Sequence, residues 1–170
     1  MVRYGLLGLI LFGLLASLIA SPRPYSLTNR PAIEAVDAIP ATADQAKLRR
    51  FLAYAAITLP NEADTGIARD QPPALGFSYR EVSLFAMPFW AYPDFGFTLY
   101  DGSEQGVRMA PLDADYRKLL DKEAGRPLGT GYDFSILPHL WGWWLPLALL
   151  LWFVLQVRYE RRKREESGII

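Results

Sequence analysis

The chain has 170 residues, and its 18 basic and 18 acidic side chains give a formal net charge of zero. It contains no cysteine, which excludes disulfides, thiolate nucleophiles and cysteine metal sites. Residues 22–139 carry 15 acidic against 12 basic side chains, and a mildly acidic segment does not favour nucleic-acid binding, which uses a basic face.

The first predicted element is an apolar helix at the N-terminus. Residues 4–20 are uncharged, and at about 1.5 Å per residue a helix of this length spans roughly 25 Å, just enough for the hydrocarbon core of a bilayer. We expect residues 1–21 to form a transmembrane helix that is retained as an uncleaved anchor. The alternative is a cleaved signal peptide, for which the residues around Ala20 make a poor cleavage site.

One face of this helix carries small side chains. Gly13, Ala16, Ser17 and Ala20 fall at i, i+3, i+4 and i+7, a spacing that lets a second helix approach closely in lipid. These four are the predicted helix-packing residues. Their partner is either the chain's own second apolar helix or a helix of another membrane protein.

An exported α+β domain is predicted for residues 22–139. It begins with a proline-rich, extended leader that reaches to about Pro40. A helix follows, for which Thr42 and Gln45 form a capping-box pattern. The apolar residues of this helix share one face, namely Leu48, Phe51, Leu52, Ala55 and Leu59.

The middle of the domain is rich in aromatic residues, with nine between positions 77 and 100. Their mixture with β-branched residues predicts two or three strands, broken near Pro88 and Pro93. Most of these rings are expected to form the core, because the domain has few other large side chains to bury. Trp90 and Tyr92, close to the prolines, are the candidate ligand-binding surface.

Two further elements complete the domain. The glycines at positions 102 and 106, Gly102 and Gly106, predict a hairpin turn that leads into another short strand. A second helix is expected to begin after the N-cap Asp113 and to end at Gly125. Two of its leucines are expected to face the core, Leu119 and Leu120.

Residues 140–157 form the second predicted transmembrane helix, again without a charge. Aromatic residues mark its two ends, as at membrane interfaces, namely Trp141, Trp143, Trp144 and Tyr159. The tail of residues 158–170 holds a basic cluster, Arg161, Arg162, Lys163 and Arg164. Such a cluster favours a cytoplasmic tail that contacts lipid headgroups. The domain of residues 22–139 then lies outside the cytoplasm, and so short a chain favours a bacterial inner membrane.

No motif for catalysis or cofactor binding stands out. Residues 101–106 imitate the start of a calcium loop, but Leu112 occupies the position of the bidentate glutamate. Asp113 and Asp115 fit a helix cap, and the single histidine, His139, cannot build a multi-histidine metal site. We therefore expect no catalytic, cofactor-binding or metal-binding residues.

These features favour a non-catalytic accessory or assembly subunit of a membrane complex, whose exported domain and helices bind an integral membrane partner. The alternative is an anchored envelope module that binds carbohydrate or peptide through aromatic side chains. A membrane-tethered hydrolase is weaker, because its acids and hydroxyls show no recognisable arrangement. The partner's identity and the oligomeric state are left open.

Overall fold

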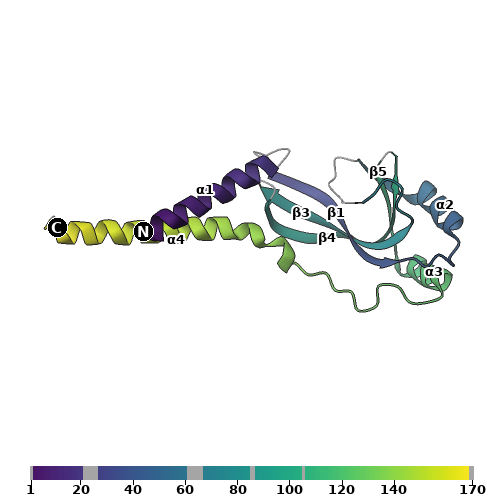
Figure 1. Cartoon of the computed structure of the whole chain (residues 1–170). Coiled ribbons are helices and arrows are strands. Elements are labelled where there is room, and N and C mark those ends of the chain that lie inside the picture. Colours follow the sequence, from purple (N-terminus) through teal and green to yellow (C-terminus); the bar gives the residue numbers. More distant parts are fainter. Residues whose placement is uncertain (1, 21–26, 61–66, 85–86, 105, 169–170) are drawn as a thin grey trace. The chain divides into compact units, whose positions relative to one another are not determined.

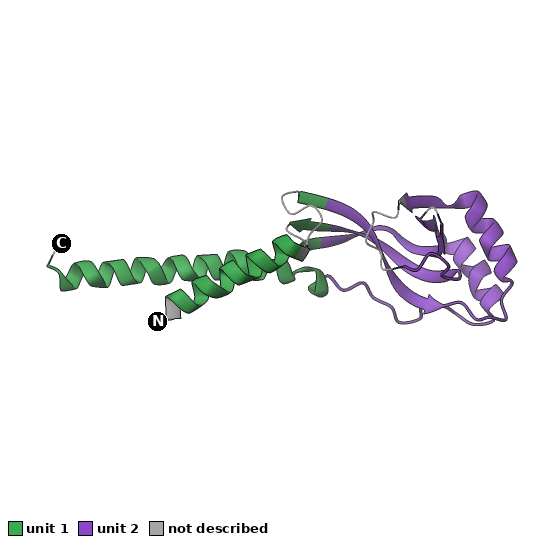
Figure 2. Cartoon of the chain, turned by 45° about the horizontal axis from the view of Figure 1, so that its top comes forward, with its two compact units in different colours: residues 1–28, 82–90, 137–170 green, residues 29–81, 91–136 purple. Residues whose placement is uncertain are grey.

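The computed structural model describes residues 2–20, 27–60, 67–84, 87–104 and 106–168, except for the side chains of residues 2, 3, 20 and 60. The chain divides into two compact units (Figure 2). Unit 1 consists of residues 1–28, 82–90 and 137–170, and unit 2 consists of residues 29–81 and 91–136. Residues 21–26, where a signal peptide would be cleaved, lie outside the described residues.

The chain is an α+β fold, as the sequence predicts. Within the described residues, five strands form one antiparallel sheet of order β1-β3-β4-β5-β2. Figure 1 labels four of them, β1, β3, β4 and β5. The strands are β1 (Leu27–Ala38), β2 (Ile57–Pro60), β3 (Ala74–Leu84), β4 (Met87–Ser103) and β5 (Gly106–Pro111). The helices are α1 (Val2–Ala20), α2 (Gln45–Ala55), α3 (Ala114–Ala124) and α4 (Trp144–Glu166), and two short 3-10 turns precede α4, η1 (Leu137–His139) and η2 (Trp141–Trp143).

Much of the proline-rich leader belongs to the sheet. β1 covers residues 27–38 and, among the described strands, pairs only with β3, so it is an edge strand. Pro31 is tolerated within it because a proline, which has no N–H to donate, does least harm at the edge of a sheet. The expected extended leader is therefore a structural strand.

The predicted break near Pro93 is wrong. β4 runs without interruption through this residue. Its described pairing with β5 begins only at Thr98, opposite Pro111. At Pro93, therefore, β4 has no described pairing with β5. The N–H that Pro93 lacks costs no hydrogen bond to β5 there.

The first helix of unit 2 begins later than the capping-box pattern predicts. Asp44, not Thr42, is the N-cap of α2, and its Oδ1 accepts a hydrogen bond of 3.0 Å from the backbone N–H of Lys47. The side chain of Gln45 donates to the carbonyl of Pro40 instead of closing a capping box. The helix ends at Ala55, and Leu59 lies in β2, which pairs with β5 in the register Ile57 to Met109.

The second helix of unit 2 matches its prediction at both ends. The Oδ1 atom of Asp113 accepts hydrogen bonds from the N–H groups of residues 115 and 116. Gly125 ends α3 in the left-handed conformation at φ 70°, which favours glycine. The prediction that Leu119 and Leu120 both face the core is wrong for Leu119, which is 61% exposed while Leu120 is buried. Adjacent helical positions point about 100° apart.

The sheet of unit 2 buries side chains on both faces. One face forms a core with α2 and α3, whose buried members are Ile39, Ala43, Leu48, Leu52, Leu75, Leu99, Ala110, Leu120, Ala124 and Leu128. The other face forms a second cluster, Ile33, Leu59, Ala74, Tyr100, Val107 and Met109. Neighbouring residues such as Leu99 and Tyr100 enter opposite clusters because side chains alternate along a strand.

Gly102 serves a close approach rather than the hairpin turn predicted for it. It lies within the β4–β5 ladder, opposite Val107. A Cβ at this position would lie 1.8 Å from the carbonyl oxygen of Ala68, so only glycine lets the two backbones meet. Gly106, with φ 134°, does lie at the start of β5, and the predicted hairpin is confirmed.

Residues 126–134 are held on the sheet by polar contacts and ring contacts. The guanidinium of Arg126 forms two hydrogen bonds to the carboxylate of Asp37, at 2.8 and 2.7 Å, and the N–H of Gly129 donates to the same carboxylate. The Tyr132 hydroxyl donates to the Glu34 carboxylate at 2.6 Å. These contacts join the segment that follows α3 to β1.

Acid should weaken this attachment. The hydrogen bonds from Arg126, and then that from Gly129, lower the pKa of Asp37 from 3.8 to about 2. A lowered pKa stabilises the folded state above the unfolded pKa, and this contribution is lost as the pH falls from about 4 through 2. The free energy of unfolding should therefore differ between the wild type and Asp37→Asn by a constant amount above about pH 4, and the difference should shrink below it. Urea titrations at stepped pH measure this difference, and one that does not change with pH would contradict the assignment.

Of the described helices, only α4 with the turn before it, Trp141–Glu166, is long and apolar enough to cross a bilayer, by length and composition alone. The apolar part of α1, Tyr4–Ile19, is shorter. The expected two-span anchoring is thus not confirmed. Pro146 lies in the first turn of α4, where its missing N–H has no helical acceptor, so the helix accommodates it.

Candidate functional site

The two apolar helices pack on each other within unit 1. Ile10 of α1 and Leu145 of α4 are buried together with Met87, the first residue of β4. Partly buried apolar side chains surround these three, namely Leu6, Leu14, Phe89, Trp144, Ala148 and Trp152. The packing joins α1, α4 and the described ends of the β3–β4 hairpin, Val82–Trp90, into one apolar body.

The predicted helix-packing residues have different surroundings. A Cβ at Gly13 would lie 2.3 Å from the Trp144 ring, so the chain's own α4 fills this position. Ser17 donates to the Gly13 carbonyl at 2.9 Å. Ala16 is exposed, and Ala20 is the last residue of α1, with a side chain outside the described set. The structure thus brings one of the four against α4 and leaves Ala16 open.

The three tryptophans predicted at the membrane interface are not equivalent. Trp141 and Trp143 are half exposed, whereas Trp144 is partly buried on α1. The Nε1 of Trp143 donates to the carbonyl of Phe89 at 2.9 Å. Gly142, between Trp141 and Trp143, is buried, and a Cβ there would lie 2.5 Å from the carbonyl oxygen of Pro88, so this close approach requires glycine. Of these three tryptophans, only Trp141 has a ring with neither a hydrogen bond nor a packing contact among those described.

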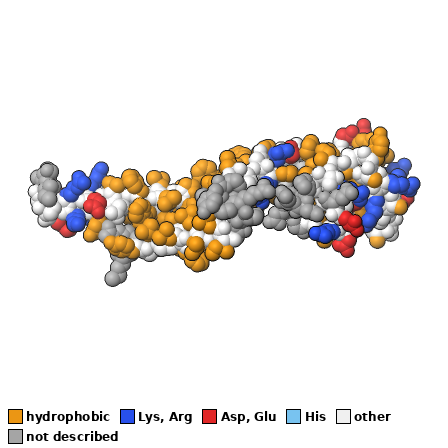
Figure 3. All heavy atoms as spheres, turned by 90° about the horizontal axis from the view of Figure 1, so that it is seen from above, with side chains coloured by type: hydrophobic (Ala, Val, Ile, Leu, Met, Phe, Trp, Pro, Cys, Tyr) orange, Lys and Arg blue, Asp and Glu red, His pale blue; other side chains and the backbone are white. Residues whose placement is uncertain are grey.

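The far end of α4 carries the basic cluster. The helix continues to Glu166, so the predicted tail is helical for most of its length. Tyr159 and the four basic residues are exposed there, Arg161, Arg162, Lys163 and Arg164. Figure 3 shows a group of positive side chains beyond a surface covered by apolar atoms.

Large apolar side chains remain exposed on both helices of unit 1. They include Leu9, Phe12, Leu15 and Ile19 on α1, and Leu147, Leu150, Leu151 and Phe153 on α4. Figure 3 shows apolar atoms over much of the visible surface of this part of the chain. A water-soluble surface rarely carries so continuous an apolar area, which marks a membrane or protein interface.

The candidate ligand-binding aromatics are both exposed. Trp90 is 52% exposed in unit 1, and Tyr92 is 36% exposed in unit 2, where its hydroxyl accepts a hydrogen bond from Asn29. Other rings of the aromatic run pack together instead. Phe77 contacts Phe97, Tyr132 and Phe134 at centroid distances of 5.3 to 5.5 Å, and Arg117 lies 3.6 Å from the centre of the Phe97 ring.

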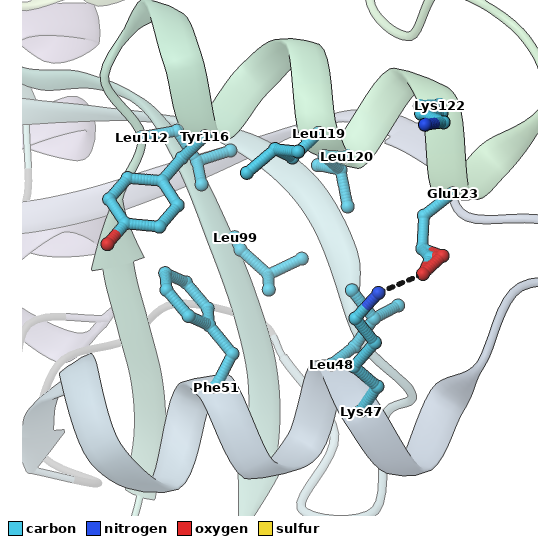
Figure 4. A pocket seen from close by; sticks show the side chains of 10 residues that line it. All are labelled: Lys47, Leu48, Phe51, Leu99, Leu112, Tyr116, Leu119, Leu120, Lys122 and Glu123. Carbon is cyan, nitrogen blue, oxygen red and sulfur yellow. Dashed lines mark hydrogen bonds and ion pairs between the residues drawn. The ribbon is translucent and has the colours of Figure 1, made fainter.

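Unit 2 holds a pocket that the sequence did not predict. It has a volume of about 440 Å³ and lies between α2 and α3 (Figure 4); we call it the α2–α3 pocket. Apolar side chains from both helices and the sheet dominate its lining, which consists of Lys47, Leu48, Phe51, Leu99, Leu112, Tyr116, Leu119, Leu120, Lys122 and Glu123. Its volume is within the range of about 300–1,000 Å³ typical of ligand-binding sites.

One sequence feature could have indicated an exposed apolar side chain at this pocket. Leu119 and Leu120 are adjacent in a helix and point about 100° apart, so burial of one side chain leaves the other closer to solvent. Both leucines line the pocket, Leu119 with an exposed side chain and Leu120 with a buried one. The other lining residues come from elements whose contact depends on the tertiary fold, and no local pattern marks them.

Within the described residues, no three His, Asp or Glu side chains cluster closely enough to hold a metal ion. Asp115 is exposed and pairs with Lys118, and His139 lies in the first 3-10 turn. No protein-family model, no curated protein and no solved structure matches this chain.

Proposed function

We propose that the protein is a non-catalytic accessory or assembly subunit of a membrane complex, which binds an integral membrane partner through its exported domain and its helices. The observation that carries this proposal is the apolar surface left uncovered in each unit. In unit 1 it lies along α1 and α4, and in unit 2 it surrounds the α2–α3 pocket. A bilayer can cover the first, and a partner protein can cover the second.

We further propose a topology for the chain. Both apolar helices span a bacterial inner membrane, residues 22–139 lie outside the cytoplasm and the basic end of α4 lies in it. The charge distribution supports this orientation, because positive residues next to a span favour the cytoplasmic side. Attachment of a cysteine-reactive, membrane-impermeant label to Leu119→Cys, but not to Ser167→Cys, in intact spheroplasts would support it. The reverse labelling would refute it.

The subunit hypothesis predicts a stable complex. Purification of the tagged full-length chain in mild detergent, with its native mass measured, should yield a stoichiometric membrane partner. Ala16→Leu should reduce the yield of this complex, because Ala16 is the exposed member of the small-residue face and a larger side chain would block a helix there. A monomer or homodimer that persists in several detergents and after cross-linking in cells would refute the hypothesis.

The exposure of Trp90 and Tyr92 favours a second candidate, an envelope module that binds carbohydrate or peptide. Exposed rings with polar edges suit both ligands. Under this alternative Trp90→Ala should abolish binding to cell-wall glycan while leaving the membrane complex intact. Under the subunit hypothesis the same variant should leave glycan retention at the background level of the wild type.

A further inference from the structure

Side-chain contacts flank the α2–α3 pocket on two sides. At one end Lys47 of α2 forms an ion pair with Glu123 of α3, and at the other the rings of Phe51 and Tyr116 lie 5.3 Å apart (Figure 4). The floor between them is apolar and includes Leu99 of the sheet. An apolar floor between two such contacts suits the insertion of one apolar side chain.

The rim of the pocket has the composition of a protein interface. Leu119 lines it and is 61% exposed, and Tyr116 is half exposed. Tyr54, which is 94% exposed, follows Phe51 by three residues on α2 and so lies on the same side of that helix. Tyrosines around a well-formed apolar pocket are typical of the centre of a protein–protein contact, where a few residues supply most of the affinity.

The charge of the side chains at the rim indicates which charge the partner carries. Lys47 is neutralised by Glu123, but the amine of Lys122 forms no ion pair within the described part of the chain. α2 contributes no acidic residue. The free positive charge next to the pocket complements a negatively charged partner.

We propose that the α2–α3 pocket is the docking site for the partner protein, which inserts one large apolar side chain between α2 and α3 and places an acidic residue opposite Lys122. This inference deepens the proposed function and rests on it. Apolar insertion provides the affinity, and the acid–Lys122 contact provides the orientation.

The test compares three variants of the full-length chain purified in dodecyl maltoside. The probe is the stoichiometric partner that co-purifies with the wild type. Leu119→Arg should abolish co-purification because the guanidinium fills the pocket mouth, and Leu119 is exposed enough for the fold to tolerate the change. Lys122→Glu should weaken the complex about tenfold, which corresponds to roughly 1.4 kcal/mol. Arg49→Glu, an equal charge change at an exposed α2 residue outside the pocket lining, should have no effect.

A cross-link identifies the inserted group. Because the chain has no cysteine, a single Leu119→Cys carries a photoactivatable reagent to the pocket mouth. The cross-linked partner peptide should contain a large apolar residue within a few positions of Asp or Glu, and reversal of that acid to Lys should restore binding to Lys122→Glu.

The outcomes separate the inference from the function on which it rests. A complex that survives both Leu119→Arg and Lys122→Glu would overturn the docking site while the subunit hypothesis stands. A wild-type homodimer that Leu119→Arg converts to a monomer would assign the pocket to a second copy and overturn the proposal. If no partner accompanies the wild type in any detergent, the subunit hypothesis fails and the docking site with it.

Discussion

Replacement of Arg108 by Met should lower the free energy of unfolding of unit 2 by about 3 kcal/mol. Arg108 forms two hydrogen bonds, of 2.9 and 2.5 Å, to the carboxylate of Asp101, which is fully buried. The same contact raises the pKa of Arg108. Loss of one partner from a buried pair costs about 3–5 kcal/mol because the other charge stays buried without compensation. The lower value applies because Arg108 keeps 26% of its side chain exposed.

A second arginine–aspartate pair of the same sheet is the matched control. Arg80 contacts Asp94 at 3.1 Å, but both side chains reach solvent, so Arg80→Met should cost less than about 1 kcal/mol. Removal of both buried charges, with Asp101→Leu added to Arg108→Met, should recover part of the lost stability. Urea unfolding of the full-length chain followed by far-ultraviolet circular dichroism measures all three. Equal effects of Arg108→Met and Arg80→Met would show that burial of Asp101 does not decide the cost.

Gly13→Leu should separate α1 from α4. The new Cβ would lie 2.3 Å from the Trp144 ring, far inside contact distance, and overpacking of this kind costs about 1–3 kcal/mol. Trp144 packs around the buried cluster of Ile10, Met87 and Leu145, so its displacement should loosen the whole of unit 1. The expected result is a lower melting temperature and altered tryptophan emission.

The same helix supplies the control for this prediction. A Cβ at Gly8 would meet nothing within 4 Å, so Gly8→Leu adds the same bulk without a clash. All five tryptophans of the chain lie in unit 1, and their fluorescence therefore reports this unit alone. If Gly8→Leu and Gly13→Leu lowered the melting temperature equally, the loss would reflect leucine in α1 and not contact with Trp144.

The Gly13 contact also changes how loss of a complex should be interpreted. Gly13 packs on the chain's own α4. Loss of a complex in Gly13→Leu would therefore be explained by damage to unit 1 and would not show that a partner helix binds there. Ala16 is exposed on the same helix and has no such ambiguity. It is therefore the residue at which binding of a partner helix is tested.

Several features were determined by the sequence alone because they depend on neighbouring residues. The ends of α3 follow from Asp113 and Gly125, whose side-chain oxygen and left-handed backbone satisfy the adjacent amides and carbonyls. The β4–β5 hairpin and the α+β class follow from the same kind of local pattern. The apolar length of α4 is likewise a property of composition.

Only the tertiary structure decided the features that join distant segments. Leader residues 27–38 became an edge strand because β3 pairs with them, and Pro93 was accommodated because β5 pairs with β4 only from Thr98 onward. Leu119 is exposed and Leu120 is buried because α2 and the sheet cover one side of α3 and leave the other open. The α2–α3 pocket is formed by side chains from two helices and the sheet, and no local sequence pattern specifies a space that exists only where these elements meet.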